Sequence, residues 1–340
     1  MNNDEEKILL SHGNGGRMMH NLIENLFLRH FTNPVLAEQS DAAILSMGTH
    51  DIAFTTDSFV IDPLFFPGGN IGKLAVCGTV NDLAVSGADP RYLSVSFIIE
   101  EGFPMTDLEQ IVVSLAAEAA KAGVVIVTGD TKVVNKGKCD KLFINTAGVG
   151  SVKDKNKLIR KAAEICPGDL ILINGTIGDH GMAVMAARES FKFKTTVTSD
   201  CASLNHLIGE VLDQSHGVKF MRDPTRGGVA TVLNELAAKT SLGIEIEELS
   251  LPMHKGVTAM CELLGFDPLH IANEGKVLIV AAQEEGPRIL EIMKKNSLGA
   301  NSAIIGRVTG DHPGKVVLKT ETGGKRIIDT LTGDPLPRIC

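Results

Sequence analysis

Apolar residues in the first half of the sequence recur with two different periods. Short runs rich in β-branched and apolar residues, bounded by turn-forming residues, predict strands at 51–62, 92–100, 124–134 and 141–149. Two longer runs predict helices at 71–86 and 107–121. The second helix has the best-defined start, because Thr106 stands at its N-cap and Glu109 follows three positions later, as in a capping box.

The second half has the same mixture of elements. Apolar runs predict strands at 169–174, 243–247, 276–282, 302–308 and 315–318. Helical periodicity predicts helices at 181–189, 204–214, 227–239, 257–264 and 287–294. A charged stretch at 153–161, followed by a Pro-Gly turn, separates the halves. We therefore expect two domains of α/β and α+β character, residues 1–152 and 153–329, and a flexible C-terminal tail at 330–340.

The composition fits a protein with sizeable cores and disfavours two classes of partner. Hydrophobic residues make up 44% of the 340 residues, while the net charge is −8 and the chain has no Trp and one Tyr. A nucleic-acid surface needs a basic face and stacking rings, so none is expected. The N-terminal residues are acidic, and no apolar run reaches the length of a membrane span. We expect a cytoplasmic protein with no membrane partner.

The cysteines point to the end of the chain. Six are scattered without a close pair, which indicates reduced thiols rather than disulfides or a zinc site. Cys340 is the last residue, and Pro335 and Pro337 hold the residues before it extended, while Gly333 can act as the hinge of this arm. A thiol on such an arm can carry a covalently attached group into a site.

Two glycine-rich segments do not match the common nucleotide-binding templates. Segment 68–74 is one residue short of a P-loop and has Leu74 where Ser or Thr must bind magnesium. Segment 13–17 lacks the strand that precedes a dinucleotide fingerprint. Its backbone amides still suit an anion, or the segment can fold over a ligand.

Four aspartates lie at the edges of apolar segments: Asp41, Asp57, Asp82 and Asp130. Asp82 is the most informative, because it stands in a predicted helix rich in Ala, Val and Leu, where an unpaired buried carboxylate is costly. Carboxylates that converge on one hard cation remove that cost. Magnesium that bridges nucleotide phosphates is the usual reason for such a cluster.

Ordered motifs spanning nearly the whole chain resemble the ATP-using superfamily of aminoimidazole ribonucleotide synthetase, which includes selenophosphate synthetase and thiamine-monophosphate kinase. They are SHGNGGR at 11–17, TDSF at 56–59, GTVNDLA at 78–84, GDTKVV at 129–134, DPTRGG at 223–228 and NEGK at 273–276. Within this superfamily, the terminal Pro337-Arg338-Ile339-Cys340 resembles the HypE family, the carbamoyl dehydratases of NiFe-hydrogenase maturation.

The resemblance implies a fold and an activity. The fold is a two-domain, ATP-binding PurM-like fold, in which N-terminal strands form a barrel with those of a second copy in a homodimer, joined to a C-terminal α+β domain. The HypE family receives a carbamoyl group on its C-terminal thiol from HypF. ATP and Mg²⁺ then serve to dehydrate this group to a thiocyanate, and the cyanide ligand goes to iron held by HypC and HypD.

The resemblance also implies roles for single residues. Cys340 would carry the carbamoyl group, Glu274 would take its N–H proton, and Lys136 would steady charge that develops near the tail. Asp57, Asp82 and Asp130 would bind magnesium. Binding of the magnesium nucleotide would further involve Asp41, Lys73, Asn81 and Lys132.

Other residues of the motifs have less definite expectations. His180 stands beside a glycine and is expected at the surface, although contact with the nucleotide or the tail is an alternative. Asp223 and Arg226 precede a predicted helix, and the sequence leaves open whether they anchor the fold or belong to the site.

Two other functions stay open at this stage. One is a small-molecule ATP-dependent synthetase or kinase of the same superfamily, in which Cys340 has no role; its ATP turnover would be indifferent to loss of that thiol. The other is a maturation scaffold whose terminal thiol only docks partners, which would hydrolyse no ATP and gain no adduct.

Overall fold

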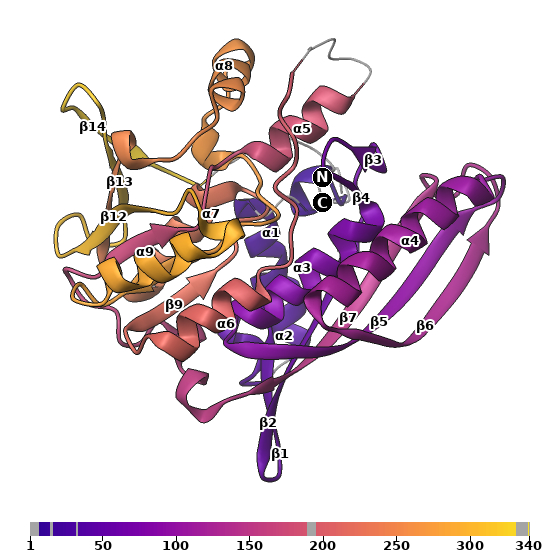
Figure 1. Ribbon diagram of the computed structural model, residues 1–340, viewed down its shortest axis with the longest axis horizontal. Helices are drawn as coiled ribbons and strands as arrows, with labels where there is room; N and C mark the ends of the chain where they lie inside the picture. Colours follow the sequence, from indigo (N-terminus) through magenta and orange to yellow (C-terminus); the bar gives the residue numbers. More distant parts are fainter. Residues whose placement is uncertain (1–6, 14–15, 32, 189–194, 331–338, 340) are drawn as a thin grey trace, which may run out of the picture.

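The computed structural model describes residues 7–13, 16–31, 33–188, 195–330 and 339. These residues form two large mixed sheets, each with helices packed against it (Figure 1). Cys340 and residues 331–338 of the expected tail lie outside the described residues. Within the described part of the chain, no helix is both long enough and apolar enough to cross a membrane.

The first sheet has five strands in the order β1-β2-β7-β5-β6. Its strands are β1 (Ala43–Met47), β2 (His50–Phe59), β5 (Ala88–Glu100), β6 (Val125–Val134) and β7 (Leu142–Val152). The four predicted strands of this half are confirmed, and β1 is an addition. Only β5 and β6 pair in parallel, because α4 (Met105–Ala122) connects them as a crossover.

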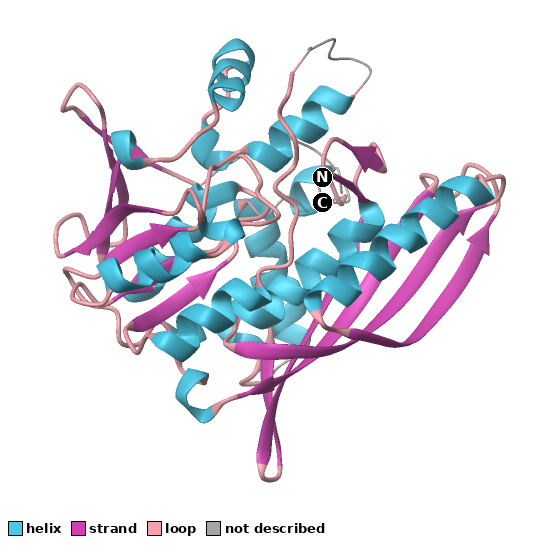
Figure 2. Ribbon diagram, in the orientation of Figure 1, coloured by secondary structure: helices cyan, strands magenta, loops and turns pink. Residues whose placement is uncertain are grey.

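Helix α3 (Ile71–Val85) lies at the centre of this half and packs against both the sheet and α4, which runs beside it (Figure 2). It follows a short hairpin of β3 (Phe65–Phe66) and β4 (Gly69–Asn70), and the Asn70 side chain caps it by accepting the N–H groups of Gly72 and Lys73. Every residue of α3 is buried except Lys73 and Asp82. Gly72 is required for the packing, because a Cβ there would lie 2.3 Å from the Ile111 carbonyl oxygen of α4.

The second sheet has seven strands in the order β14-β13-β10-β12-β8-β11-β9. Its strands are β8 (Leu170–Ile173), β9 (Val218–Arg222), β10 (Gly243–Glu247), β11 (Leu278–Ala281), β12 (Ala303–Thr309), β13 (Val316–Lys319) and β14 (Lys325–Ile328). The helices of this half are α5 (Asp179–Ala187), α6 (Asn205–Gln214), α7 (Gly228–Thr240), α8 (Lys255–Leu264) and α9 (Gly286–Lys295). All predicted strands and helices of this half are confirmed, while β9 and β14 were not predicted.

Both faces of the second sheet are buried, which explains its continuous apolar runs. Leu172 of β8 packs in one cluster with α6 and α9, whereas its neighbours Ile171 and Ile173 pack in another cluster with α7. The first of these clusters also includes Ala84 and Val85 from the end of α3. The two sheets are therefore joined through a shared apolar contact at the C-terminal end of α3.

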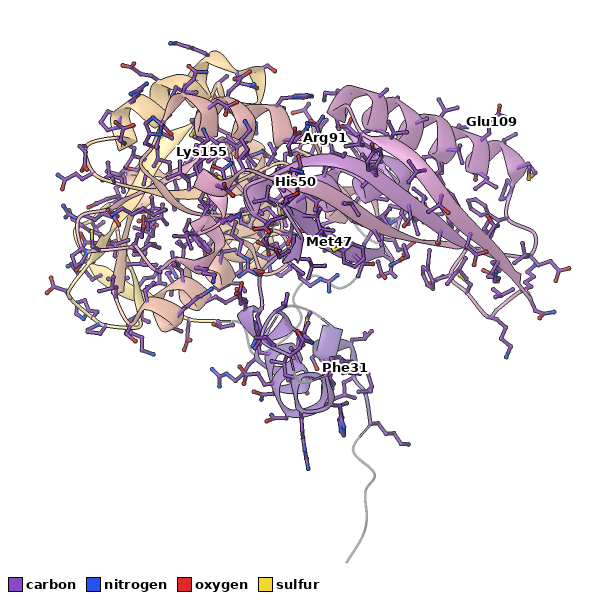
Figure 3. All side chains as sticks on the ribbon, turned by 90° about the horizontal axis from the view of Figure 1, so that it is seen from below. Phe31, Met47, His50, Arg91, Glu109 and Lys155 are labelled. Carbon is purple, nitrogen blue, oxygen red and sulfur yellow. The ribbon has the colours of Figure 1, made fainter. Side chains whose placement is uncertain are left out.

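Two features near the chain start and α4 differ from expectation. Helix α4 begins at Met105 with Pro104 as its N-cap, so the predicted capping box at Thr106 is wrong; the Thr106 hydroxyl lies 3.5 Å from the Asp107 carboxylate instead. An unpredicted helical run also precedes the first sheet, formed by α1 (Arg17–Leu22), η2 (Ile23–Phe27) and α2 (Leu28–His30). It projects from the body and ends near the exposed Phe31 (Figure 3).

Candidate functional site

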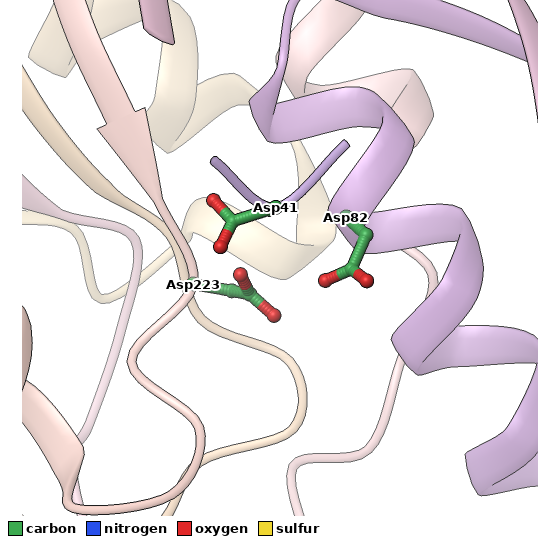
Figure 4. A group of neighbouring side chains, drawn as sticks. All are labelled: Asp41, Asp82 and Asp223. Atoms are coloured by element: carbon green, nitrogen blue, oxygen red, sulfur yellow. The ribbon is translucent and has the colours of Figure 1, made fainter. Parts of the chain in front are cut away.

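Three aspartates from distant parts of the sequence meet between the two sheets. Asp41 precedes β1, Asp82 lies in the last turn of α3, and Asp223 directly follows β9. Their carboxylates point toward one another (Figure 4), and one oxygen from each lies within 4.8 Å of the others. Oxygens around an octahedral magnesium ion at 2.0–2.1 Å are separated by roughly 3 to 4 Å, so this donor set fits that ion.

Hydrogen bonds from both halves hold the cluster in place. Arg222 donates from Nε to Asp41 Oδ1 at 2.8 Å and from Nη1 to Glu235 at 2.8 Å. Thr55 of β2 lies 3.0 Å from Asp82 Oδ2 through its hydroxyl. These bonds fix the carboxylates, yet Arg222 supplies only one positive charge to three acidic groups.

The excess negative charge shifts the acid–base equilibria of the cluster. Burial, followed by the charges of Asp223, Asp41 and Asp57, raises the pKa of Asp82 well above its ordinary value. Burial and Asp41 likewise raise the pKa of Asp223 to about 7. A divalent cation would offset this repulsion, which is the property expected of a cation site.

Asp57 lies next to the cluster. Both Asp57 and the cluster line a cavity of about 960 Å³. Burial raises the pKa of Asp57, while the Ser58 N–H, at 2.7 Å from Oδ1, and the Arg226 charge act in the opposite direction. Gly78 of α3 leaves room for it, because a Cβ there would lie 2.9 Å from the Phe59 ring and 3.3 Å from Asp57 Oδ2. The cavity is wide enough for a nucleotide-sized ligand.

Glu274 lines the same cavity as a buried acid. Its residue is 3% exposed, and its Oε1 atom is buried without a hydrogen-bond partner in the described residues. Burial, followed by the charges of Asp223 and Asp200, raises the pKa of Glu274 well above its ordinary value. An unsatisfied buried carboxylate oxygen next to a cavity is positioned to accept a proton from a bound ligand.

Three expected site residues lie elsewhere in the single chain. Asp130 and Lys132 of β6 form an exposed ion pair at 2.7 Å, and Lys136 lies exposed in the turn after that strand. The strand register aligns Asp57 of β2 with Gly129 of β6, the residue before Asp130. Strands β7 and β5 lie between them. Three strand spacings correspond to about 14 Å. Within one chain, therefore, Asp130 does not share an ion with Asp57 and Asp82, contrary to expectation.

Asn81 and Lys73 also have surroundings that differ from the expected phosphate contacts. Asn81 is buried; its Nδ2 donates to the Ala202 carbonyl at 3.1 Å, and its Oδ1 accepts the Leu204 N–H at 2.8 Å. It thus joins α3 to the second half of the chain. Lys73 donates to the Gly68 carbonyl at 3.0 Å and stands nine residues before Asp82, about 13.5 Å along the helix.

Two residues matter more than the sequence indicated. Asp223, left open between anchor and site, is a full member of the carboxylate cluster. His180, expected at the surface, is completely buried, and its Nε2 lies 2.8 Å from the carbonyl oxygen of Ile339. Ile339, the penultimate residue, is itself only 3% exposed. The sequence signal for Asp223 was its place directly before Pro224 at the end of a strand, but that strand was not recognised.

Comparisons with known proteins find similar sequences and structures over nearly the whole chain. Family models described as AIR synthase related protein, N-terminal and C-terminal domain, match residues 39–152 and 166–319. Carbamoyl dehydratase HypE of Rhizobium leguminosarum bv. viciae is 49% identical over 335 residues, covering 98% of this chain and 95% of that protein.

Two solved structures are similar over most of their length. A HypE–HypF complex matches with a TM-score of 0.86 and 48% identity, covering 91% of this chain and 99% of that one. HypE in complex with ATP matches with a TM-score of 0.82 and 44% identity, covering 98% and 100%. The resemblance drawn from the ordered motifs and the expected two-domain fold are thereby confirmed.

Proposed function

This chain belongs to the HypE family of carbamoyl dehydratases, and from that premise we propose that it uses ATP to dehydrate a carbamoyl group on its C-terminal thiol. The product is a thiocyanate, which supplies the cyanide ligand of NiFe-hydrogenase iron. The observation that carries the proposal is the shared cavity, which is lined both by the aspartate cluster and by Glu274, whose buried Oε1 has no hydrogen-bond partner among the described residues.

ATP and magnesium bind at the aspartate cluster in this proposal. The relative whose structure contains ATP is similar over nearly the whole chain, which supports ATP as the phosphoryl donor. Asp41, Asp82 and Asp223 would hold Mg²⁺, with Asp57 beside them on the cavity wall. When bound, the ion neutralises phosphate charge and orients the γ-phosphoryl group.

The chemistry requires a leaving group and a base. The carbamoyl oxygen takes the γ-phosphoryl group of ATP, and ADP departs. Loss of the two nitrogen-bound protons, with departure of phosphate carrying the former carbamoyl oxygen, converts S–C(=O)–NH₂ into S–C≡N. Glu274 accepts an N–H proton, since its raised pKa makes the ionised carboxylate a stronger base than an exposed one.

The tail delivers the thiol to this chemistry. Ile339 is buried next to His180, so the residue that precedes Cys340 lies inside the protein rather than in solvent. The carbamoyl donor must reach the same thiol, which requires the tail to leave this position. Cys340 itself therefore acts as a carrier between an inner and an outer site.

A homodimer completes the site in this proposal. Residues 125–133 of the edge strand β6 are all exposed in the single chain, including Val125, Val127 and Val133. An edge strand with apolar side chains open to solvent is a typical pairing surface. A second copy seated there would bring its Asp130 and Lys132, and the following Lys136, toward a cavity that lacks them.

The partners and the compartment also belong to the proposal. HypF serves as carbamoyl donor, which the similarity to the chain of a HypE–HypF complex supports. HypC and HypD receive the cyanide on iron. A cytoplasmic location is inferred from the spacing of the cysteines, because cysteines that are far apart in the sequence and form no C-x-x-C pair suit a reducing compartment.

The alternatives find less support. A small-molecule kinase would not need a buried penultimate residue. A scaffold would not need a buried glutamate, with one oxygen unpaired among the described residues, in the same cavity as a carboxylate cluster. The test is incubation with HypF, carbamoyl phosphate, ATP and magnesium, followed by peptide mass spectrometry. The proposal expects a cyano adduct on Cys340 that is absent from Cys340→Ala. An unmodified Cys340 under conditions in which HypF is active would contradict it.

A further inference from the structure

The penultimate residue of the chain has a built binding place. The Ile339 side chain is buried, and its backbone carbonyl oxygen lies 2.8 Å from Nε2 of His180. His180 is the second residue of α5 and has no exposed surface. A buried side chain and a buried hydrogen bond at the extreme end of a chain distinguish this contact from a frayed terminus.

The partners of His180 determine which ring nitrogen carries the proton. A carbonyl oxygen only accepts, so Nε2 must be the N–H that donates to Ile339. The other nitrogen, Nδ1, lies 2.8 Å from the hydroxyl of Ser199. In the neutral ring, which burial favours, Nδ1 accepts the Ser199 O–H. The Ser199 oxygen in turn accepts the Cys201 N–H at 3.1 Å.

The ring is also held sterically. The Phe66 ring meets it edge to face, with centroids 5.3 Å apart and planes at 89°. The Ser199 N–H donates to the Pro67 carbonyl at 2.7 Å, which ties the loop after α5 to the β3–β4 hairpin. His180 therefore presents its Nε2–H in a fixed direction before any tail arrives.

The loop that orients His180 also holds the segment of Glu274. Asp200, between Ser199 and Cys201, accepts the backbone N–H groups of Glu274 at 3.2 Å and Gly275 at 3.1 Å. Its carboxylate forms a buried ion pair with Lys276 at 2.8 Å. One short loop thus contacts, on one side, the residue that binds the tail and, on the other, the turn that carries the proposed base.

We propose that His180 is the docking residue for the C-terminal tail. Its Nε2–H holds the Ile339 carbonyl, and the loop 199–201 links the docked tail to the Glu274 turn. His180 is a positioning residue, because it touches the backbone before the reacting thiol and not the thiol itself. Its consequence for dehydration rests on the proposed function, whereas docking of the tail does not.

Two substitutions of His180 distinguish its hydrogen bond to Ile339 from its packing against neighbouring residues. Gln places its amide nitrogen near the position of His Nε2, so His180→Gln keeps the donor to Ile339. Asn places its amide near the position of Nδ1, so His180→Asn keeps a partner for Ser199 but is too short to reach the tail. A matched control is His206→Asn, since exposed His206 also contacts a backbone carbonyl, that of Lys121 at 3.0 Å, in another part of the protein.

The measurement is the rate at which iodoacetamide alkylates Cys340, followed on the C-terminal peptide by mass spectrometry without ATP or HypF. Exposed Cys166 reports general reactivity in the same samples. Loss of one buried hydrogen bond, worth about 1.4 kcal/mol, should raise the Cys340 rate about 10-fold in His180→Asn. His180→Gln and His206→Asn should stay within about 2-fold of wild type. An unchanged rate in His180→Asn, or an equal increase in His180→Gln, would overturn the proposal.

A second measurement tests whether docking of the tail affects the dehydration step. With HypF present, His180→Asn should still be carbamoylated on Cys340 and bind ATP normally, but it should form thiocyanate about 10-fold more slowly. If alkylation shows docking and no protein forms thiocyanate, the proposed function fails and the docking stands. If thiocyanate forms normally in His180→Asn while alkylation is unchanged, the docking fails and the function stands.

Discussion

The carboxylate of Asp200 accepts the backbone N–H of Glu274 at 3.2 Å, while one buried oxygen of the Glu274 side chain has no partner in the part of the chain that the structure describes. Asp200 is buried and is paired with Lys276, so the turn at Glu274 is held by charge-assisted bonds rather than by its own side chain. The acid is therefore fixed in position and left available for a ligand.

This relationship predicts a large effect of Asp200→Asn on stability. The substitution keeps an acceptor oxygen but leaves the Lys276 charge buried and unpaired, and breaking a buried pair costs about 3 kcal/mol. We expect the free energy of unfolding in urea to fall by about that amount. The control is Asp213→Asn, which breaks exposed pairs with Lys153 and Lys155 and should change it by less than about 0.5 kcal/mol. Equal effects in the two variants would contradict the role of Asp200.

Glu274→Gln should block the proton transfer with little change of shape. Carbamoylation of Cys340 should continue, while conversion to thiocyanate should slow by about 10²-fold, the usual contribution of a positioned base. Glu118→Gln is the matched control, because it also replaces a buried glutamate. Glu118 accepts the Ser203 hydroxyl at 2.8 Å. A wild-type dehydration rate in Glu274→Gln would assign the proton to another group.

The homodimer predicts complementation between two inactive variants. If each site combines Glu274 of one chain with Asp130 of the other, a mixed dimer of Asp130→Asn and Glu274→Gln contains one intact site. Random exchange of equal amounts should then restore about a quarter of the wild-type dehydration rate. Mixtures that remain as inactive as their components would show that Asp130 acts within its own chain or not at all.

The raised pKa values of the aspartate cluster predict an unusual dependence of stability on pH. Folding raises the pKa of Asp223 from 3.8 to about 7, so between these values the folded protein binds a proton that the unfolded chain has released. Stability without metal should therefore fall as pH rises from about 4 to about 7, by at most ~1.4 kcal/mol per pH unit.

Thermal unfolding with and without magnesium checks this dependence. Without metal, Asp223→Asn should flatten the decline, because it removes the titrating group. Magnesium should stabilise the wild-type protein more at pH 8 than at pH 5, since the ion competes with protons for the same oxygens. A magnesium effect that is independent of pH would contradict binding at this cluster.

The sequence predicted the elements whose periodicity is strong, and it identified Asp82 because a carboxylate in an apolar helix needs a partner. It could not place Asp130, since separation across a sheet depends on strand order and not on distance along the chain. Asp223 was left open because β9, with Lys219 and Arg222 among its five residues, has no clear strand pattern. The contact of His180 with Ile339 joins two residues 159 positions apart, so no local pattern in the sequence could indicate it.

In the proposed reaction, Cys340 carries the group that Glu274 and ATP convert. The most direct measurement is a single turnover of the carbamoylated protein with ATP and magnesium, with peptide mapping of the thiocyanate and quantification of ADP. Thiocyanate is expected on Cys340 alone, in an amount equal to ADP, and none is expected without ATP. Thiocyanate formed without ATP, or found on Cys139 or another internal cysteine, would contradict it.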